Sequence, residues 1–238
     1  MQVLPGGTLM YTNLPLRAIV SQAYNLPFNS LEWLSGPEWI NSEKFDIEAT
    51  APPGVIPAGL PEKQRNDKSM LMLQSVLADR FRMTARWETK QGPVYSLTVS
   101  KNGLKLPKAK TTEEDCPEVS SRTGYCHMFV GGQGNGVHGK RVEISDLVAF
   151  LDNWTDHPVI NNTGVKGFFD IDTEGWVSMR PRPGPPPGTE PSAEDREYAD
   201  PARPTLQQVL DKVGLKLEST KGPFQILVID HVERPSEN

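Results

Sequence analysis

The chain has 238 residues, of which 37% are hydrophobic and 23% are charged, and its net charge is −5. This composition is typical of a folded globular protein, and the acidic balance lacks the basic footprint that nucleic-acid binding requires. No apolar run approaches the ~20 residues that a membrane-spanning helix needs. Residues 1–7 show neither the charged nor the apolar region of a signal peptide. We therefore expect no nucleic-acid partner and no transmembrane segment in this chain.

One pattern of helix, strand, proline-rich loop, helix and two strands occurs twice, over residues 9–101 and 137–232. The positions that match between the copies are mainly apolar, and apolar matches indicate a shared core. Repetition at this long period indicates a tandem duplication rather than a solenoid. The sequence therefore predicts an α+β protein with two pseudo-symmetric lobes, each a small sheet packed with two helices.

The first elements of the two copies match at a constant offset. Apolar residues at helical spacing predict one helix within 14–23 and its counterpart within 142–151. Next, Phe45–Glu48 and Phe169–Asp172 alternate apolar and acidic side chains, which predicts one strand in each lobe.

The later elements also repeat. A second helix is predicted around residues 73–77 and again around 206–210, from apolar residues at the i, i+3, i+4 positions. Each of these helices precedes two β-rich runs separated by a Gly-Pro pair, Gly92-Pro93 in the first copy and Gly222-Pro223 in the second. A Gly-Pro pair between two such runs predicts a β-hairpin.

These elements predict three parts of the chain. Residues 1–107 form the first lobe, 108–136 a linker with a disulfide loop, and 137–238 the second lobe with a proline-rich insertion at 178–204. The composition of the insertion favours an extended polyproline conformation. The interface between two lobes is the default place for a ligand site.

The linker contains the two cysteines of the chain, Cys116 and Cys126. A close pair in a segment rich in Ser, Thr and Gly is typical of a disulfide in an oxidising compartment, and two reduced thiols in a cytosolic loop are the alternative. The same linker contains a glycine-rich run, Gly131–Gly136. We expect a flexible connector there rather than a phosphate cradle, because no strand leads directly into the run and no helix starts directly after it.

Several motifs, in this order along the chain, resemble the soil-associated protein family abundant in Acidobacteria. They are Asn13-Leu14-Pro15-Leu16 with Ala23-Tyr24, Gly36–Ile40 leading to Phe45-Asp46-Ile47, Asn162–Asp170, and the closing segment Val228–Asn238. The resemblance implies a protein exported to the periplasm or the exterior, found alone or fused to membrane metallopeptidases of the antibiotic-sensor type, with no agreed reaction. The repeat unit is also similar to the small α+β modules at the N-termini of secretins and TonB-dependent receptors.

Three acidic residues, Asp170, Asp172 and Glu174, fall at alternate positions of the predicted second-lobe strand. Alternate residues project from one face, so the three carboxylates could hold a hard cation such as Ca²⁺, the one cofactor for which the sequence offers ligands. The alternative is a set of ordinary solvated acids, because Asp46 and Glu48 repeat the first two positions in the other lobe.

Candidates for acid–base chemistry are few. Asp156-His157 lies after the first helix of the second lobe, and His231 ends the last predicted strand. A histidine beside a carboxylate can act as a general base, although neighbouring residues in a strand point to opposite faces. The chain has no Gly-x-Ser-x-Gly, His-x-His-x-Asp or His-Glu-x-x-His motif. These residues best allow metal-assisted hydrolysis of a small ester or lactone.

Three tryptophans, Trp39, Trp154 and Trp176, fall in or beside predicted loops. They are candidates for stacking against a ligand, and the alternative is that they attach those loops to the core. The leading hypothesis for function is an exported, noncatalytic recognition module for a small ligand, a peptide or an envelope partner, at the lobe interface or along a sheet edge. The alternatives are a Ca²⁺-dependent ester or lactone hydrolase and a structural envelope protein.

Overall fold

The computed structural model describes residues 2–4, 8–27, 32–57, 60, 62–116, 126–177, 179, 190 and 202–235, and its mixed helices and strands confirm the α+β class. The chain forms two compact units. Unit 1 contains Met1–Lys90 and Gln225–Asn238, and unit 2 contains Gln91–Phe224. This division differs from the predicted lobes, because the closing segment of the chain belongs to unit 1. Most of the predicted insertion at 178–204 lies outside the described residues.

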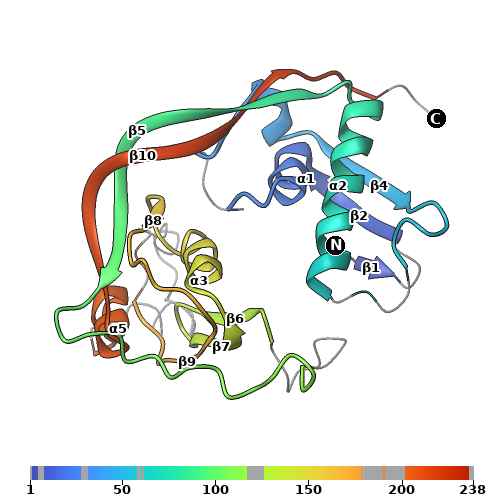
Figure 1. Cartoon of the computed structure of the whole chain (residues 1–238). Coiled ribbons are helices and arrows are strands. Elements are labelled where there is room, and N and C mark those ends of the chain that lie inside the picture. Colours follow the sequence, from blue (N-terminus) through green and yellow to red (C-terminus); the bar gives the residue numbers. More distant parts are fainter. Residues whose placement is uncertain are drawn as a thin grey trace. The chain divides into compact units, whose positions relative to one another are not determined.

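Unit 1 is built on an antiparallel sheet in the order β1-β2-β4, formed by β1 (Gln2–Leu4), β2 (Thr8–Pro15) and β4 (Lys44–Thr50). Two helices, α1 (Leu16–Ala23) and α2 (Glu62–Arg80), contact each other beside it, and a short 3-10 helix, η1 (Glu38–Asn41), precedes β4 (Figure 1). The apolar stripes predicted from the sequence form the core. Its buried members include Leu16, Ile19 and Val20 of α1 and Leu73 and Leu77 of α2.

Unit 2 repeats this plan with an antiparallel sheet in the order β6-β7-β9, formed by β6 (Phe129–Gly132), β7 (Gly136–Val142) and β9 (Phe169–Asp172). Its helices are α3 (Ile144–Leu151) and α5 (Leu206–Lys212). Both begin with a capping box, made by Glu143 with Asp146 and by Thr205 with Gln208, which satisfies backbone N–H groups of the first turn.

The longest strands, β5 (Thr84–Val99) and β10 (Leu215–His231), each run without interruption through residues of both units. They are the central strands of a four-stranded sheet in the order β3-β10-β5-β8, where β3 (Leu34–Ser35) pairs with β10 and β8 (Val159–Asn161) pairs with β5. The repeats therefore exchange strands. The end of β5 completes unit 2, and the end of β10 completes unit 1.

The predicted hairpins at Gly92-Pro93 and Gly222-Pro223 are wrong, because both pairs lie inside these continuous strands. The glycines provide space rather than a turn. A Cβ on Gly92 would lie 3.0 Å from the Phe224 ring, and a Cβ on Gly222 would lie 3.1 Å from Val94. A glycine opposite a large side chain permits two strands to approach closely. A Gly-Pro pair can therefore occur inside a continuous strand as well as in a turn.

A repeated irregularity joins the first two elements of each unit. The pairing of β2 with β4 shifts register before Leu14, and the pairing of β7 with β9 shifts at the equivalent place before Val142. The residue at each bulge has positive φ, 55° at Asn13 and 50° at Arg141. Its backbone N–H donates to an aspartate of the neighbouring strand, Asn13 to Asp46 Oδ1 at 2.7 Å and Arg141 to Asp170 Oδ1 at 3.0 Å. The repeated aspartates are therefore structural residues of the bulge.

The linker predicted at 108–136 is more ordered than expected where it is described. Lys108 and Ala109 lie along β9, and the glycine-rich run, predicted as a flexible connector, forms the β6–β7 turn. Cys116 and Cys126 form the predicted disulfide, with their Cα atoms 5.7 Å apart. No helix within the described ranges is long and apolar enough to cross a bilayer.

Candidate functional site

An open hollow of about 600 Å³ lies on unit 2, where β5, β8 and β10 run side by side. Val94 and Ser96 of β5 face it, whereas the residues that alternate with them, Tyr95 and Leu97, belong to the core. The hollow therefore lies on the face of these strands that is opposite the core. Its lining consists of Val94, Ser96, Ile160, Asn162 and residues 218–223.

The hollow combines an apolar part with polar groups. Val94 is fully buried, and its side chain and that of Ile160 lie close to Gly222. Asn162 donates to Ser96 Oγ at 2.8 Å, and Glu218 forms an ion pair with Lys216 at 2.6 Å. Among the described residues, the exposed ammonium of Lys221 has no hydrogen-bonding or ionic partner.

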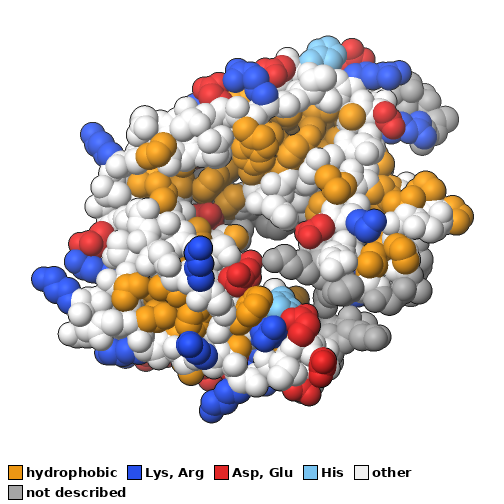
Figure 2. Space-filling view, viewed as in Figure 1, with side chains coloured by type: hydrophobic (Ala, Val, Ile, Leu, Met, Phe, Trp, Pro, Cys, Tyr) orange, Lys and Arg blue, Asp and Glu red, His pale blue; other side chains and the backbone are white. Residues whose placement is uncertain are grey.

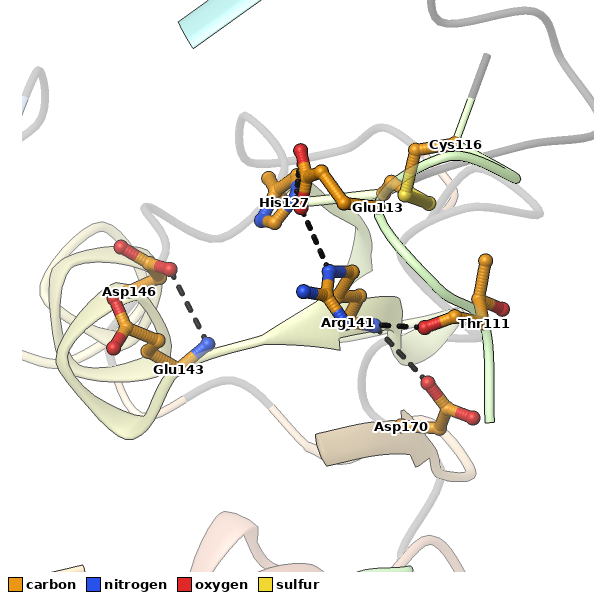
Figure 3. A network of polar contacts seen from close by, with 9 residues as sticks. Thr111, Glu113, Cys116, His127, Arg141, Glu143, Asp146 and Asp170 are labelled. Atoms are coloured by element: carbon orange, nitrogen blue, oxygen red, sulfur yellow. Dashed lines mark hydrogen bonds and ion pairs between the residues drawn. A yellow bond between two sulfur atoms is a disulfide. The ribbon is translucent and has the colours of Figure 1, made fainter. Parts of the chain in front are cut away.

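Elsewhere on unit 2, polar contacts converge on Arg141 beside the disulfide (Figure 3). Its guanidinium donates from Nε to Glu113 at 2.8 Å and from Nη1 to the Thr111 carbonyl at 3.2 Å, and it lies 4.4 Å from the centre of the Phe168 ring. Glu113 also binds His127 Nε2 at 2.9 Å, and these contacts lower the pKa of its carboxyl, mainly through the bond from Arg141. The network attaches the segment around Cys116 to β7.

The three predicted metal ligands point to three different partners. Asp170 accepts hydrogen bonds from the backbone of Arg141 and Lys110, Asp172 binds His138 Nδ1 at 2.7 Å, and Glu174 lies beyond the end of β9 and pairs with Lys212. Within the described part of the chain, no group of three or more His, Cys, Asp or Glu side chains has an arrangement that could hold a metal ion. Ca²⁺ binding by these carboxylates stays a prediction without support from this geometry.

The structure places His157 and Asp156 in a small polar cluster with Tyr95. The Tyr95 hydroxyl donates to Asp156 Oδ1 at 2.9 Å, and His157 Nε2 lies 3.8 Å from Asp156 Oδ2. Burial and the bond to Asp156 raise the pKa of Tyr95 to about 12. His231 lies in unit 1, where it binds Glu233 at 2.9 Å. The predicted acid–base residues are thus divided between the units, and Tyr95 faces away from the hollow.

Asp152, at the C-terminus of α3, is a titratable group that sequence reasoning missed. Its Oδ1 accepts a hydrogen bond from the Val159 backbone at 2.7 Å, and burial raises its pKa to about 7 against the lowering effect of that bond. An aspartate in an unfolded chain titrates at about pH 4. The folded chain holds this proton more tightly than the unfolded chain does. The contribution of Asp152 to the free energy of unfolding is therefore fully present below about pH 4 and is lost as the pH rises towards 7.

We expect Asp152→Asn to remove that loss, since the amide oxygen can still accept from Val159 and carries no charge. The variant should match the wild type near about pH 4 and exceed its free energy of unfolding by roughly 2 kcal/mol near pH 8, which is less than the full linkage energy because part of the side chain meets water. Urea unfolding at both pH values measures the difference. A gap between the two proteins that does not change with pH would contradict the raised pKa.

The three candidate tryptophans pack within the units. Trp176 is fully buried and meets Trp154 edge-on with ring centres 6.3 Å apart, in the core of unit 2. Trp39 is half-buried in unit 1 between Phe45 and the Arg234 guanidinium. All three rings pack against side chains of their own unit, and ligand stacking at the half-buried Trp39 and Trp154 stays a prediction. A ligand could reach Trp176 only if the surrounding chain moved.

The fold and the hollow define a duplicated α+β protein with exchanged strands and an open, mixed apolar and polar surface site. A family model matches residues 17–232, and the chain belongs to that family, which is described as "Protein of unknown function (DUF3738)". No curated protein and no solved structure matches the chain. The family description names no reaction and no ligand. It also mentions neither soil bacteria nor the secretin-type modules.

Proposed function

We propose that the protein is an exported, noncatalytic recognition module that binds a small organic anion in the hollow of unit 2. The observation that carries this proposal is the hollow itself, whose volume of about 600 Å³ lies within the ~300–1,000 Å³ typical of small-molecule sites. Its walls come from strands rather than from loops alone, and strands hold a site more rigidly.

The lining supports an anion with an apolar body. The half-buried Ile160 offers apolar surface, and the Lys221 ammonium supplies a positive charge that no described side chain neutralises. The hydroxyl groups of Ser219 and Thr220, also in the lining, can donate hydrogen bonds to carboxylate oxygens. On the face shown in Figure 2, basic and acidic side chains are interspersed without a large area of one sign.

Export is supported by the disulfide between Cys116 and Cys126, because disulfides persist mainly in oxidising compartments. Glu113 and His127, which belong to the Arg141 network, lie close in sequence to Cys116 and Cys126. The disulfide therefore helps to hold these two residues together.

The proposal is tested with pairs of small arylacetic acids and their methyl esters, which differ in charge but hardly in shape. We expect acids to shift amide signals of residues 218–223 in an NMR titration and the esters to bind about tenfold more weakly or worse. Lys221→Ala should weaken acid binding by a similar factor. Lys101→Ala is the matched control, because Lys101 is an exposed lysine of unit 2 outside the hollow.

The same samples report on catalysis, because hydrolysis of a methyl ester releases methanol and the corresponding acid. Ester turnover by the wild type that is lost in His157→Ala would support the hydrolase alternative. Signal shifts that are equal for acid and ester, or unchanged in Lys221→Ala, would contradict recognition of an anion at this site.

A further inference from the structure

The strand pair β2–β4 of unit 1 and the strand pair β7–β9 of unit 2 are equivalent residue by residue. In unit 1, Leu14 pairs with Phe45 and Tyr11 with Ile47, and in unit 2, Val142 pairs with Phe169 and Gly139 with Ile171. The spacing on both strands and the position of the bulge are the same. A backbone group that points outward from β9 therefore has a counterpart that points outward from β4.

In unit 2, the outer edge of β9 is covered by an extended segment, Pro107–Lys110. The Ala109 N–H donates to the Phe168 carbonyl at 2.9 Å, and the Asp170 N–H donates to the Pro107 carbonyl at 3.0 Å. The Lys110 N–H also donates to Asp170 Oδ2 at 3.3 Å. This segment brings two lysines, Lys108 and Lys110, to a strand that carries Asp170 and Asp172.

In unit 1, the equivalent edge has no such cover among the described residues, where β4 is the last strand of its sheet and pairs only with β2. The equivalent outward groups are the Lys44 carbonyl and the N–H groups of Asp46 and Glu48, which we call the β4 edge. The side chains of all three residues are exposed. Asp46 Oδ1 accepts a hydrogen bond from the Asn13 N–H. Its Oδ2 has no hydrogen-bond partner among the described residues.

We propose that the β4 edge binds an extended segment of a partner protein that carries lysines at alternate positions, as an added β-strand. The backbone groups supply hydrogen bonds, as Phe168 and Asp170 do in unit 2. The exposed carboxylates of Asp46 and Glu48 favour a basic occupant. This site is separate from the hollow, because β4 lies in unit 1 and the hollow in unit 2.

The probe is a fluorescent peptide with the sequence of Leu104–Thr112, which contains the segment that covers β9. We expect it to bind the full chain in an anisotropy titration. N-methylation at the Ala109 position should weaken binding about tenfold or more, since that N–H would donate to the Lys44 carbonyl. N-methylation at the neighbouring Lys108 position is the matched control and should change affinity less than about twofold, because its N–H points away from the covered strand.

Variants of the protein locate the site. Glu48→Pro removes an outward N–H from an edge strand, where proline is tolerated, and Glu48→Ala keeps that N–H. Provided that both variants keep the wild-type melting temperature, we expect loss of binding with proline and a smaller decrease with alanine. If Glu48→Pro fails to fold, the comparison of the two N-methylated peptides on the wild type tests the proposal.

The proposal is overturned by no binding, by equal effects of the two N-methyl groups, or by full binding to a folded Glu48→Pro chain, which would place the peptide on β9. Concentration-dependent self-association that Glu48→Pro abolishes would instead identify the occupant as a second copy.

Discussion

If the chain is cleaved between the two repeats, the two fragments should remain associated. Each compact unit contains residues from both sides of such a cut, because Gln225–Asn238 belongs to unit 1 and Gln91 onward belongs to unit 2. In unit 1, Leu227 and Ile229 of β10 are 1% and 7% exposed, and in unit 2, Leu97 of β5 is fully buried. Separation of the fragments would expose these side chains at about 1.5–3 kcal/mol each, together with the backbone bonds of the exchanged strands.

The experiment places a protease site between Val119 and Ser120, then reduces the Cys116–Cys126 disulfide, which would otherwise hold the cut ends together. Size-exclusion chromatography of the cut, reduced protein should give one peak at the mass of the whole chain, and a denaturing gel should show two fragments. Leu227→Ala should favour separation more than Val228→Ala, because Val228 is only half-buried on the same strand. Independent elution of the two wild-type fragments would show that the repeats do not exchange strands.

Replacing Gly136 by alanine should cost about 3–5 kcal/mol of the free energy of unfolding, the largest effect that we expect from one added methyl group at a glycine that the structure describes. Gly136 has a φ of 87°, and a Cβ there would lie 2.0 Å from the Thr173 carbonyl oxygen. That contact cannot be relieved by a side-chain rotation, because the contacted oxygen belongs to the backbone. Thr173 is held against β7 by its N–H, which donates to the Val137 carbonyl, and by its Oγ1, which accepts from the Val137 N–H. The β6–β7 turn and the start of β7 would have to shift.

Gly164→Ala is the control for this effect, because Gly164 has a φ of 64° and nothing lies within 4 Å of its added Cβ. Only the cost of the left-handed backbone applies, so we expect a loss of about 1 kcal/mol. Guanidinium unfolding of the two variants beside the wild type separates backbone preference from close approach. Equal losses in both variants would mean that the Thr173 contact adds nothing.

Sequence reasoning found the elements whose cause is local. The stripe that includes Ile19 and Val20 forms α1, and the alternation in Phe169–Asp172 forms β9, because apolar periodicity determines which face an element buries. The hairpins were wrong because the Gly-Pro signal is local, whereas the choice between turning back and continuing depends on contacts with residues about 130 positions away, such as Gly92 with Phe224.

The candidate site was harder to predict for the same reason. Asp170 and Asp172 alternate as expected, yet their partners, Arg141 and His138, come from β7. The positive φ at Arg141 has no sequence signal, since arginine rarely adopts it. The hollow assembles side chains of three strands, so no single motif reports it. The match between Asp46 and Asp170 in the two repeats indicated solvated acids, whereas the shared role of the two aspartates is to accept the backbone N–H of the bulge.

The exchange of strands also determines when the protein can fold. The core of unit 1 contains Leu9 but also Leu227 and Ile229, which a ribosome adds only after the residues of unit 2. Its core therefore cannot close until β10 has been made, and the pairing of β3 with β10 joins residues almost 200 positions apart, Leu34 and Leu227. Contacts of such long range slow folding because the chain must first close a large loop. The part of unit 1 that precedes unit 2 in the sequence therefore lacks its partner strand until all of unit 2 has been made.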